Sequence, residues 1–578
     1  MMKATKALPI CSALLAGCLS AAATYGAGYT PVTDARLANP EPGNWLMTRG
    51  NYQGWSYSSL DQINTGNVKR LVPVWAVATG VNSGLQAPPL VNNGMMFVGT
   101  PSAQVLALDA RNGNVIWRYK RELPDDFSAL HNTNRGVALY GDKVYVMGLE
   151  PVLIALDAKT GNVVWEQKLE DYHTGYYSTM APLIVKGKVL AGVSGGEFGV
   201  RGFVAAFDAE TGTPAWKTYT IPGPGDPGGN TWPSDTWKRG GGATWMTGTY
   251  DPDTNLVFWG VGNASPWFGD QRPGDNLYTA STIALDPSTG AIRGHFQYHW
   301  NDSWDWDEMN APMVVDYKMG GKTVKGLLKP ARNGYLYWLS RSAPAGGGSV
   351  IGFVHATNYV KQDVFKSIDP NTGRPTYNDD KKPGTGKKAS FCPSLWGGKD
   401  WPFESYNPKT GMVYIPANEN HCGFLDGKVQ EYVPGKWWTG VDIPDIGFTV
   451  NKDATFFGDV QAWDVSGGKK VWDWKVPKSM MWGSILSTAG GLVFVGGTND
   501  RKFRALDGKT GQVLWEFITN SGIIAPPVSY TLDGKQYIAV ASGWGVDAQF
   551  QQGLLSNLLP GWDKSIPEGG VIWAFAVQ

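Results

Sequence analysis

An excess of charge of one sign is missing from this sequence. Its 578 residues include 50 lysines and arginines and 50 aspartates and glutamates, so the formal net charge at pH 7 is zero. Without a basic excess, the chain lacks the field that holds the phosphates of a nucleic acid or the headgroups of an anionic membrane. We therefore expect no nucleic-acid partner and no electrostatic membrane binding.

Long apolar runs are also scarce. The one extended stretch runs from Ala7 to Ala23, is rich in alanine, and follows Lys3 and Lys6. A short apolar stretch behind positive charges is typical of a signal peptide and too short for a stable membrane span. We predict that residues 1–27 are a signal peptide, that the mature protein is periplasmic, and that it has no transmembrane segment.

The cleavage site stays open between two alternatives. Small residues from Ala21 to Ala27 offer signal-peptidase sites. The run Leu15-Ala16-Gly17-Cys18 instead resembles a bacterial lipoprotein box, in which Cys18 would carry a lipid anchor. We favour soluble export.

Cysteine is rare as well. Of the four cysteines, Cys392 and Cys422 are the only ones beyond the predicted signal peptide. In an oxidising compartment we expect them to form a disulfide, with two buried thiols as the alternative. No Cys-x-x-Cys-His motif occurs, which excludes a covalently attached c-type haem on this chain.

Glycine, proline and tryptophan are abundant instead, with 75, 37 and 27 residues spread along the chain. They recur in one pattern, in which alanine, an apolar residue and aspartate are followed by glycine and then tryptophan. Degenerate copies lie between residues 249 and 411. The clear copies begin at Ala107, Ala155, Ala206, Ala462 and Ala505, and they end at Trp117, Trp165, Trp216, Trp472 and Trp515.

Each copy of the pattern predicts a strand, a turn and a second strand. The aspartate can accept hydrogen bonds from the turn backbone, and glycine supplies the positive φ of the turn. The tryptophan should dock on the next repeat. We predict an all-β fold, an eight-bladed β-propeller with tryptophan-docking repeats over residues 28–578, at roughly 69 residues a blade. The insertions between residues 217 and 460 are where we expect the site.

The repeats and the stretch of residues 482–494 resemble the pyrroloquinoline quinone (PQQ) dehydrogenases, whose type members oxidise methanol or ethanol. The resemblance covers essentially the whole mature chain. Non-catalytic propellers of the outer-membrane assembly type share the repeat, so the polar residues between the repeats have to decide.

A glycine-rich segment from Ser194 to Gly202 resembles the family's metal-binding loop. The resemblance makes Glu197 a metal ligand and places Ser194, Gly195 and Gly196 close to the cofactor. A flat quinone can approach the backbone only where side chains are absent. The alternative is a glycine-rich turn with a solvated glutamate.

Two further residues match the family in glycine-rich surroundings. Trp245 follows Gly240-Gly241-Gly242, and Asn263 follows Gly262. The resemblance makes Trp245 the floor beneath the quinone, because a planar electron-poor ring stacks well on an indole. Asn263 would give the metal a carbonyl oxygen.

The run Trp304-Asp305-Trp306-Asp307 resembles the catalytic segment of the family. Asp305 matches the catalytic base and a metal ligand. In an extended chain residues two apart face the same way, so Asp307 could reach the same metal. A second acid here resembles the lanthanide-dependent members, and three carboxylates with Glu197 suit a trivalent cation. We expect one metal ion, a lanthanide with Ca²⁺ as the alternative; Asp307 could instead be a solvated carboxylate.

Arginine completes the catalytic set. The resemblance makes Arg332 both catalytic and cofactor-binding, since a guanidinium group can grip carboxylates and quinone oxygens with paired hydrogen bonds. The other residues that the resemblance assigns to PQQ are Gln86, Arg135, Thr179, Asn418, Trp482 and Gly483.

Two departures from the family concern the upper face of the quinone. The methanol and ethanol members carry two adjacent cysteines that cap it, and this chain has Ala129 and Leu130 there. A family glutamate is replaced by Gln86. Both changes favour an alcohol bulkier than methanol, primary or secondary.

The resemblance implies a PQQ-dependent alcohol dehydrogenase. Asp305 would take the hydroxyl proton as hydride passes to metal-polarised PQQ, and a soluble cytochrome c would receive the electrons. A homodimer is also open. The alternatives are a non-catalytic scaffold or binding protein and a propeller hydrolase or lyase with paired carboxylates.

Overall fold

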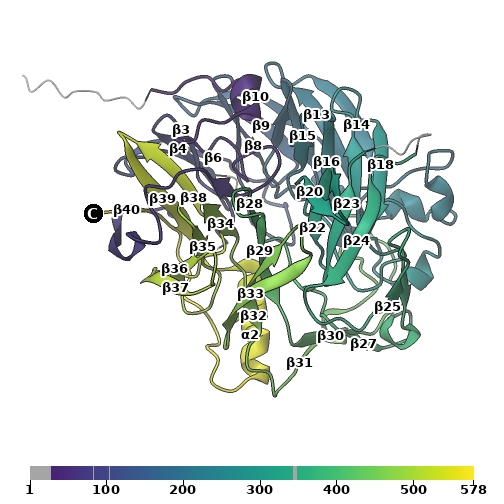
Figure 1. Ribbon diagram of the computed structural model, residues 1–578. Coiled ribbons are helices and arrows are strands. Elements are labelled where there is room, and N and C mark those ends of the chain that lie inside the picture. Colours follow the sequence, from purple (N-terminus) through teal and green to yellow (C-terminus); the bar gives the residue numbers. More distant parts are fainter. Residues whose placement is uncertain (1–27, 83, 103, 343–347) are drawn as a thin grey trace, which may run out of the picture.

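The computed structural model describes residues 28–82, 84–102, 104–342 and 348–578 (Figure 1). The predicted signal peptide and Cys18 lie outside the described residues. Strands dominate the described ranges, which contain two α-helices, α1 (Asp34–Ala38) and α2 (Val546–Leu558). None of the helices in these ranges is both long and apolar enough to cross a bilayer.

The described strands form eight sheets of four or five strands, a number compatible with the eight blades predicted. Figure 1 shows the sheets following one another around the molecule in chain order. The first four sheets are β3 (Leu90–Asn92), β4 (Met95–Thr100), β5 (Gln104–Asp109) and β6 (Val115–Lys120); β7 (Ala138–Tyr140), β8 (Lys143–Met147), β9 (Val152–Asp157) and β10 (Val163–Lys168); β11 (Leu183–Val185), β12 (Lys188–Gly192), β13 (Phe203–Asp208) and β14 (Pro214–Tyr219); and β15 (Thr249–Asp251), β16 (Leu256–Val261), β17 (Ser281–Leu285) and β18 (Ile292–Gln297).

The other four sheets complete the circle. They are β19 (Met313–Val314), β22 (Gly326–Pro330), β23 (Tyr335–Ser340) and β24 (Gly352–Asn358); β28 (Ser405–Asn407), β29 (Met412–Asn418), β32 (Gly458–Asp464) and β33 (Lys469–Val476); β34 (Ile485–Thr488), β35 (Leu492–Val495), β36 (Lys502–Asp507) and β37 (Val513–Ile518), with β1 (Tyr57–Ser58) parallel to β34; and β38 (Val528–Leu532), β39 (Lys535–Ser542), β40 (Val571–Val577) and β2 (Leu71–Ala78).

The last sheet closes the ring. Its outermost strand, β2, comes from near the N-terminus and pairs antiparallel with β40 at the C-terminus. Pairing the two ends of the chain in one sheet leaves the ring without an open blade.

The repeated tryptophans dock as predicted. The indole Nε1 of Trp117 donates to Ala158 O in the next repeat at 2.9 Å. A Cβ on Gly161 would lie 2.6 Å from the same indole, and Gly161 has φ of 75°. The glycine of the pattern is therefore required twice, for the turn and for the docking of the preceding tryptophan.

The aspartate of the pattern also acts as predicted. Asp157 Oδ1 accepts hydrogen bonds from the N–H groups of Lys159 and Thr160 at 3.1 and 2.8 Å. These bonds satisfy turn donors that would otherwise need water.

The middle of the chain carries the insertions. Three smaller sheets lie outside the eight: β20 (Tyr317–Met319) with β21 (Lys322–Val324); β25 (Phe365–Ile368) with β26 (Pro375–Tyr377); and β27 (Ala389–Phe391), β30 (His421–Leu425) and β31 (Ile446–Val450). The predicted disulfide is confirmed, since Cys392 and Cys422 are joined beside β27 and β30. In Figure 1 α2 lies next to β31 at the lower edge.

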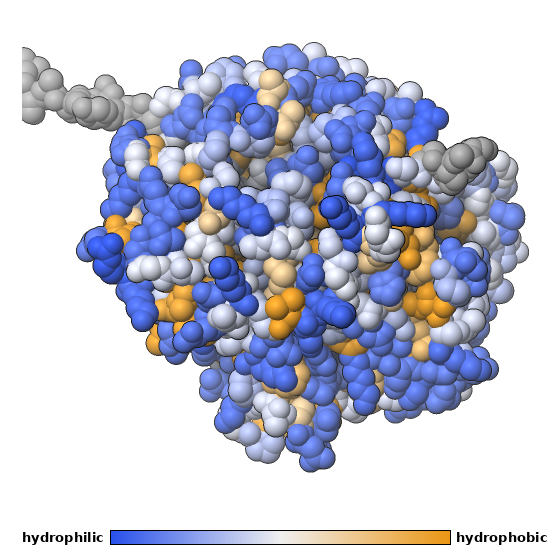
Figure 2. Space-filling model, viewed as in Figure 1, coloured by the Kyte–Doolittle hydropathy of each residue, from blue (hydrophilic) through white to orange (hydrophobic). Residues whose placement is uncertain are grey.

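The face of the molecule shown in Figure 2 has no extended hydrophobic patch among its described residues. Figure 2 shows a mostly hydrophilic face on which hydrophobic residues are scattered singly or in small groups. Scattered apolar residues are ordinary on a folded protein and need no partner.

Candidate active site

Backbone hydrogen bonds tie the predicted site loops to one another, blade by blade. Ser194 N donates to Tyr177 O at 2.8 Å, and Thr244 N donates to Val193 O at 2.8 Å. Gly262 N then donates to Ala243 O at 2.8 Å. Segments far apart in the sequence are thereby held side by side.

Glycine allows the metal-site loops to approach closely. A Cβ on Gly196 would lie 3.2 Å from Asn263 Oδ1, and one on Gly262 would lie 2.3 Å from Asp307 Oδ1. Asn263 N donates to Asp307 Oδ1 at 2.6 Å. The structure thus brings Asn263 and Asp307 together beside the loop that carries Glu197.

Arg332 lies on the other side of Asp307. Its Nη1 is 3.4 Å from Asp307 Oδ2 and 3.2 Å from Asp400 Oδ1, and all three side chains are buried. Asp305 is also buried, and its Oδ1 has no hydrogen-bond partner among the described residues. Its backbone has φ of 61°, a strained conformation for a non-glycine residue that is typical of functional sites.

Burial and mutual repulsion raise the pKa values of the three carboxylates. Burial, reinforced by Asp307, raises the pKa of Glu197 to about 7. Burial raises the pKa of Asp307 to about 6, against the opposing charge of Arg332. Burial also raises the pKa of Asp305 well above its ordinary value. Carboxylates that resist ionisation in this way would be relieved by a bound cation.

The donor set fits a hard cation. Carboxylate and amide oxygens are the ligands that such ions prefer, and Asp305 Oδ1 has unused acceptor capacity. Across the described ranges no three histidine, cysteine, aspartate or glutamate side chains already converge as a ligand cage. The carboxylates are neighbours that sense one another's charge, and a cation would have to draw them inwards.

A second group of predicted residues surrounds Trp245. The guanidinium carbon of Arg135 lies 4.4 Å from the centroid of the Trp245 ring, and Arg135 also donates to the Thr179 hydroxyl. The hydroxyls of Thr179 and Ser194 lie 3.3 Å apart. Four residues predicted to bind PQQ are therefore in mutual contact.

Gln86 lies near this group, in the segment between β2 and β3. Leu85 pairs with Asn134, which places Gln86 beside the segment that carries Arg135. Gln86 is buried, and its Oε1 has no hydrogen-bond partner within the part of the chain that the structure describes. An unused buried acceptor on a segment that pairs with the Arg135 segment fits a polar ligand such as PQQ.

Asn418 has a different environment from the one predicted. Its Nδ2 donates to Met481 O at 3.2 Å and its Oδ1 accepts from Met481 N at 2.7 Å. The side chain supports the backbone next to Trp482. A Cβ on Gly483 would lie 2.4 Å from Gly496 O, so this pair sits where two segments touch.

Four nearby residues escaped the sequence prediction: Asp400, Trp401, Asp547 and Gln551. The Trp401 ring lies 5.5 Å from the Arg135 guanidinium carbon. Gln551 Oε1 accepts from Trp482 Nε1 at 2.6 Å. Asp400 and Trp401 follow Gly397-Gly398, the same kind of signal that distinguished Trp245, whereas α2 carries no motif.

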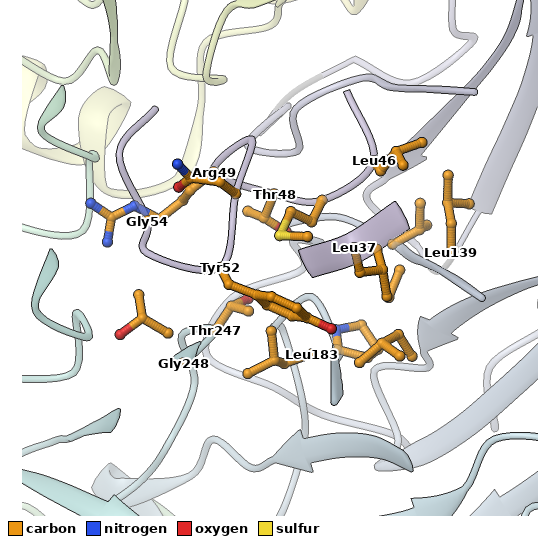
Figure 3. Close-up of a pocket in the computed structure, with 17 residues that line it drawn as sticks. Leu37, Leu46, Thr48, Arg49, Tyr52, Gly54, Leu139, Leu183, Thr247 and Gly248 are labelled. Atoms are coloured by element: carbon orange, nitrogen blue, oxygen red, sulfur yellow. The ribbon is translucent and has the colours of Figure 1, made fainter. Parts of the chain in front are cut away.

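A separate small cavity lies elsewhere in the protein (Figure 3). Leu37, Leu46, Tyr52, Leu139 and Leu183 are among the residues that line it. Its volume of about 30 Å³ accommodates one or two waters and not a tricyclic quinone. It is therefore not the cofactor site.

A family model described as the β-propeller domain of glucose, ethanol and alcohol dehydrogenases, with PQQ as its name, matches residues 45–351 and 478–538. The quinoprotein alcohol dehydrogenase PedH of Pseudomonas putida is 38% identical over 96% of this chain and 95% of its own length. The chain belongs to the PQQ-dependent alcohol dehydrogenase family. This quinoprotein is thus an enzyme, and the scaffold and hydrolase alternatives are set aside.

Other relatives agree. The dehydrogenase subunit of a quinone-linked alcohol dehydrogenase from Gluconacetobacter polyoxogenes is 37% identical, over 96% of this quinoprotein and 78% of that subunit. The solved structure of a europium-containing methanol dehydrogenase superposes with a TM-score of 0.86 at 34% identity, covering 94% of this chain and 99% of that one. Membership of the family implies PQQ and a metal ion.

Proposed function

We propose that this quinoprotein oxidises a primary or secondary alcohol bulkier than methanol in the periplasm, with PQQ and one lanthanide ion. Asp305 carries this proposal, because it is a buried carboxylate with a free oxygen beside Asp307 and within the field of Arg332. A soluble cytochrome c would take the electrons, since no haem motif lies on this chain.

In the proposed reaction, Asp305 Oδ1 accepts the proton of the substrate hydroxyl as the carbon is oxidised. Burial raises the pKa of Asp305, which makes the ionised carboxylate a stronger proton acceptor. When bound, PQQ would supply a two-electron acceptor and the metal ion a Lewis acid. Ion pairs with Asp307 and Asp400 hold the positively charged guanidinium group of Arg332 beside this region.

The metal ligands that we propose are Glu197, Asn263, Asp305 and Asp307. Three carboxylates whose pKa values are all raised favour a trivalent ion over Ca²⁺, because the additional charge relieves more repulsion. The europium named for a structural relative is consistent with this choice.

The residues that we propose bind PQQ are Gln86, Arg135, Thr179, Ser194, Gly195, Gly196, Trp245, Arg332, Trp482 and Gly483. Asn418 would hold the segment that carries Trp482 in place. Trp245 would supply the stacking surface. Arg135, which lies over that surface, would move aside to grip the carboxylates of PQQ.

A dye-reduction screen tests the proposal. The exported protein is loaded with PQQ and with either La³⁺ or Ca²⁺, and linear and branched alcohols of graded size are compared. We expect the highest kcat/KM for alcohols larger than methanol and higher activity with La³⁺. Highest activity on methanol would overturn the size assignment, and equal activity with Ca²⁺ would overturn the metal assignment.

A further inference from the structure

Three segments meet along one rim of the site. Leu85 N donates to Gly543 O at 3.1 Å, and Gly84 N donates to Trp544 O at 3.2 Å. Leu85 also pairs with Asn134. The start of α2 is therefore attached to the segments that carry Gln86 and Arg135.

Helix α2 packs on the aromatic residues of the site. Ala548 and Leu555 belong to the same apolar cluster as Trp482, and Trp245 packs against that cluster. Gln551 holds the Trp482 indole at 2.6 Å. The helix thus contributes to the walls around the predicted cofactor position.

The backbone conformation of Val546, the first residue of α2, sets the direction of Asp547. Val546 has φ of 53°, which is unfavourable for a β-branched side chain and persists only where the surroundings enforce it. A Cβ on Gly84 would lie 2.9 Å from Val546 Cγ2, so the two segments are tightly packed. This packing fixes the backbone direction at Asp547.

Asp547 is partly exposed and lies within the electrostatic reach of the charged groups of the site. Its side chain is 22% exposed, and its Oδ1 lies 3.5 Å from His131 Nε2. Burial lowers the pKa of Arg135 to about 10, and among the charged groups Asp547 does most to oppose that change. Asp547 also adds to the repulsion that, after burial, raises the pKa of Asp400.

The contact with His131 leaves Asp547 available. At 3.5 Å the pair is a loose electrostatic contact and not a close hydrogen bond. The carboxylate therefore keeps acceptor capacity for a donor that enters the site. His131 follows Leu130, one of the two positions at which other family members carry the capping cysteines.

We propose that Asp547, steadied by His131, is a substrate-specificity residue that binds an ammonium group on the far end of an alcohol substrate. The quinoprotein would then prefer amino alcohols to alkanols of the same length. This inference rests on the proposed function, because it deepens the substrate class of the same site.

The charges around the site support a cationic partner. The groups within one another's field are the carboxylates Glu197, Asp305, Asp307, Asp400 and Asp547 and the cationic side chains Arg135, Arg332 and Lys399. When all five carboxylates are ionised, negative charge is in excess, and PQQ adds more. A metal ion would neutralise the negative charge of Asp305 and Asp307, whereas Asp547 on the rim would stay available to bind the substrate.

The test measures discrimination by the loaded enzyme. We compare kcat/KM for 4-amino-1-butanol, 1-butanol and 4-hydroxybutyrate, at a pH near 7.5, where an alkylammonium group with a pKa of about 10 is protonated. Assays with 1-butanol contain an equal concentration of butylamine, which separates activation by amines from substrate binding. We expect the amino alcohol to be favoured about tenfold and the hydroxy acid to be the poorest substrate.

Variants of Asp547 and His131 test whether this pair causes the preference for the amino alcohol. Asp547→Asn should lower the preference for the amino alcohol about tenfold, mainly through KM, and Asp547→Glu should keep it within about threefold. His131→Gln should lower it by a smaller factor. Asp563→Asn, at an exposed acid near α2, is the matched control and should leave all three substrates unchanged.

A binding measurement without turnover completes the test. Butylamine should raise the melting temperature of the loaded parent enzyme and not that of Asp547→Asn. If alkanols are oxidised but the parent does not favour the amino alcohol, or Asp547→Asn discriminates as the parent does, the inference is wrong and the proposed function stands. If the parent with PQQ and either metal oxidises no alcohol, the proposed function fails first.

Discussion

The floor and the rim of the site are built differently. The floor consists of the loops that carry Ser194, Trp245 and Asn263, and backbone hydrogen bonds and close glycine contacts join them. On the rim, backbone hydrogen bonds anchor the start of α2, but the side chains of His131 and Asp547 contact each other only loosely. The backbone of the floor tolerates little change, whereas the side chains of the rim can vary with the substrate.

The largest expected effect is at Asp305. Asp305→Asn keeps the shape of the side chain and removes the proton acceptor, so dye-linked alcohol oxidation should fall about 1,000-fold. Melting temperature and the PQQ absorption band should stay close to those of the parent. Retained activity would remove Asp305 from the role of base.

Gly262→Ala tests how rigid the floor is. The new Cβ would lie 2.3 Å from Asp307 Oδ1, which has no room to move without breaking its bond to Asn263. We expect a loss of about 1–3 kcal/mol in the free energy of unfolding and metal binding weakened about 100-fold. Gly28→Ala, where nothing lies within 4 Å of the new carbon, is the control. Unchanged metal affinity would show that the floor can yield.

The pH dependence of metal binding tests the repulsion among the carboxylates. Since the pKa of Glu197 is about 7 and that of Asp307 about 6, both must lose protons to bind a cation. We expect lanthanide affinity, followed by titration calorimetry, to rise about 100-fold between pH 5.5 and pH 8.

In the protein without a bound cation, a rise in pH should lower the folding stability. Raised pKa values in the folded state mean that its stability falls as the pH rises from about 4 through 7. Glu197→Gln should remove much of that fall in a melting curve. A parent protein whose metal-free melting temperature rises across this window would contradict the predicted repulsion.

Asp307→Ala should change the preferred metal more than the total activity. Removing one carboxylate lowers the advantage of a trivalent ion, so the ratio of activity with La³⁺ to activity with Ca²⁺ should fall about tenfold. Side-by-side assays of parent and variant measure that ratio. An unchanged ratio would count against Asp307 as a ligand.

The smallest effect is expected far from the floor and the rim. Trp472→Phe keeps a six-membered aromatic ring but removes the pyrrole part of the indole, together with the hydrogen bond from Nε1 to Gly508 O, which spans 3.2 Å. The free energy of unfolding in urea should fall by about 2 kcal/mol with kcat/KM unchanged. A change in activity would mean that the blade interfaces and the site are coupled.

The repeat made the blades predictable from the sequence. The glycine and tryptophan of each copy interact with the adjacent copy, so a local pattern carries information about a long-range contact. The close approach of the floor loops was indicated by glycine clusters, which mark positions where segments of backbone come close. The pairing of Cys392 with Cys422 followed from the lack of any other cysteine beyond the predicted signal peptide.

Asn418 and Asp400 show where prediction from the sequence stopped. The amide of Asn418 matched a cofactor residue by position, but its two polar atoms bond the backbone of Met481. Asp400 lies 3.2 Å from Arg332, although 67 residues lie between them in the sequence. No local pattern encodes a contact between side chains that only the packing of successive blades brings together.

The sequence by itself determined the all-β repeat, the family and the residue types of the floor, because each depends on patterns a few residues long. Only the tertiary structure decided what occupies the rim. Helix α2 lies more than four hundred residues from His131 in the chain, and its Asp547 reaches the site because β2 and β40 close the ring. The charge on the rim is therefore a property of the closed propeller and not of any one segment.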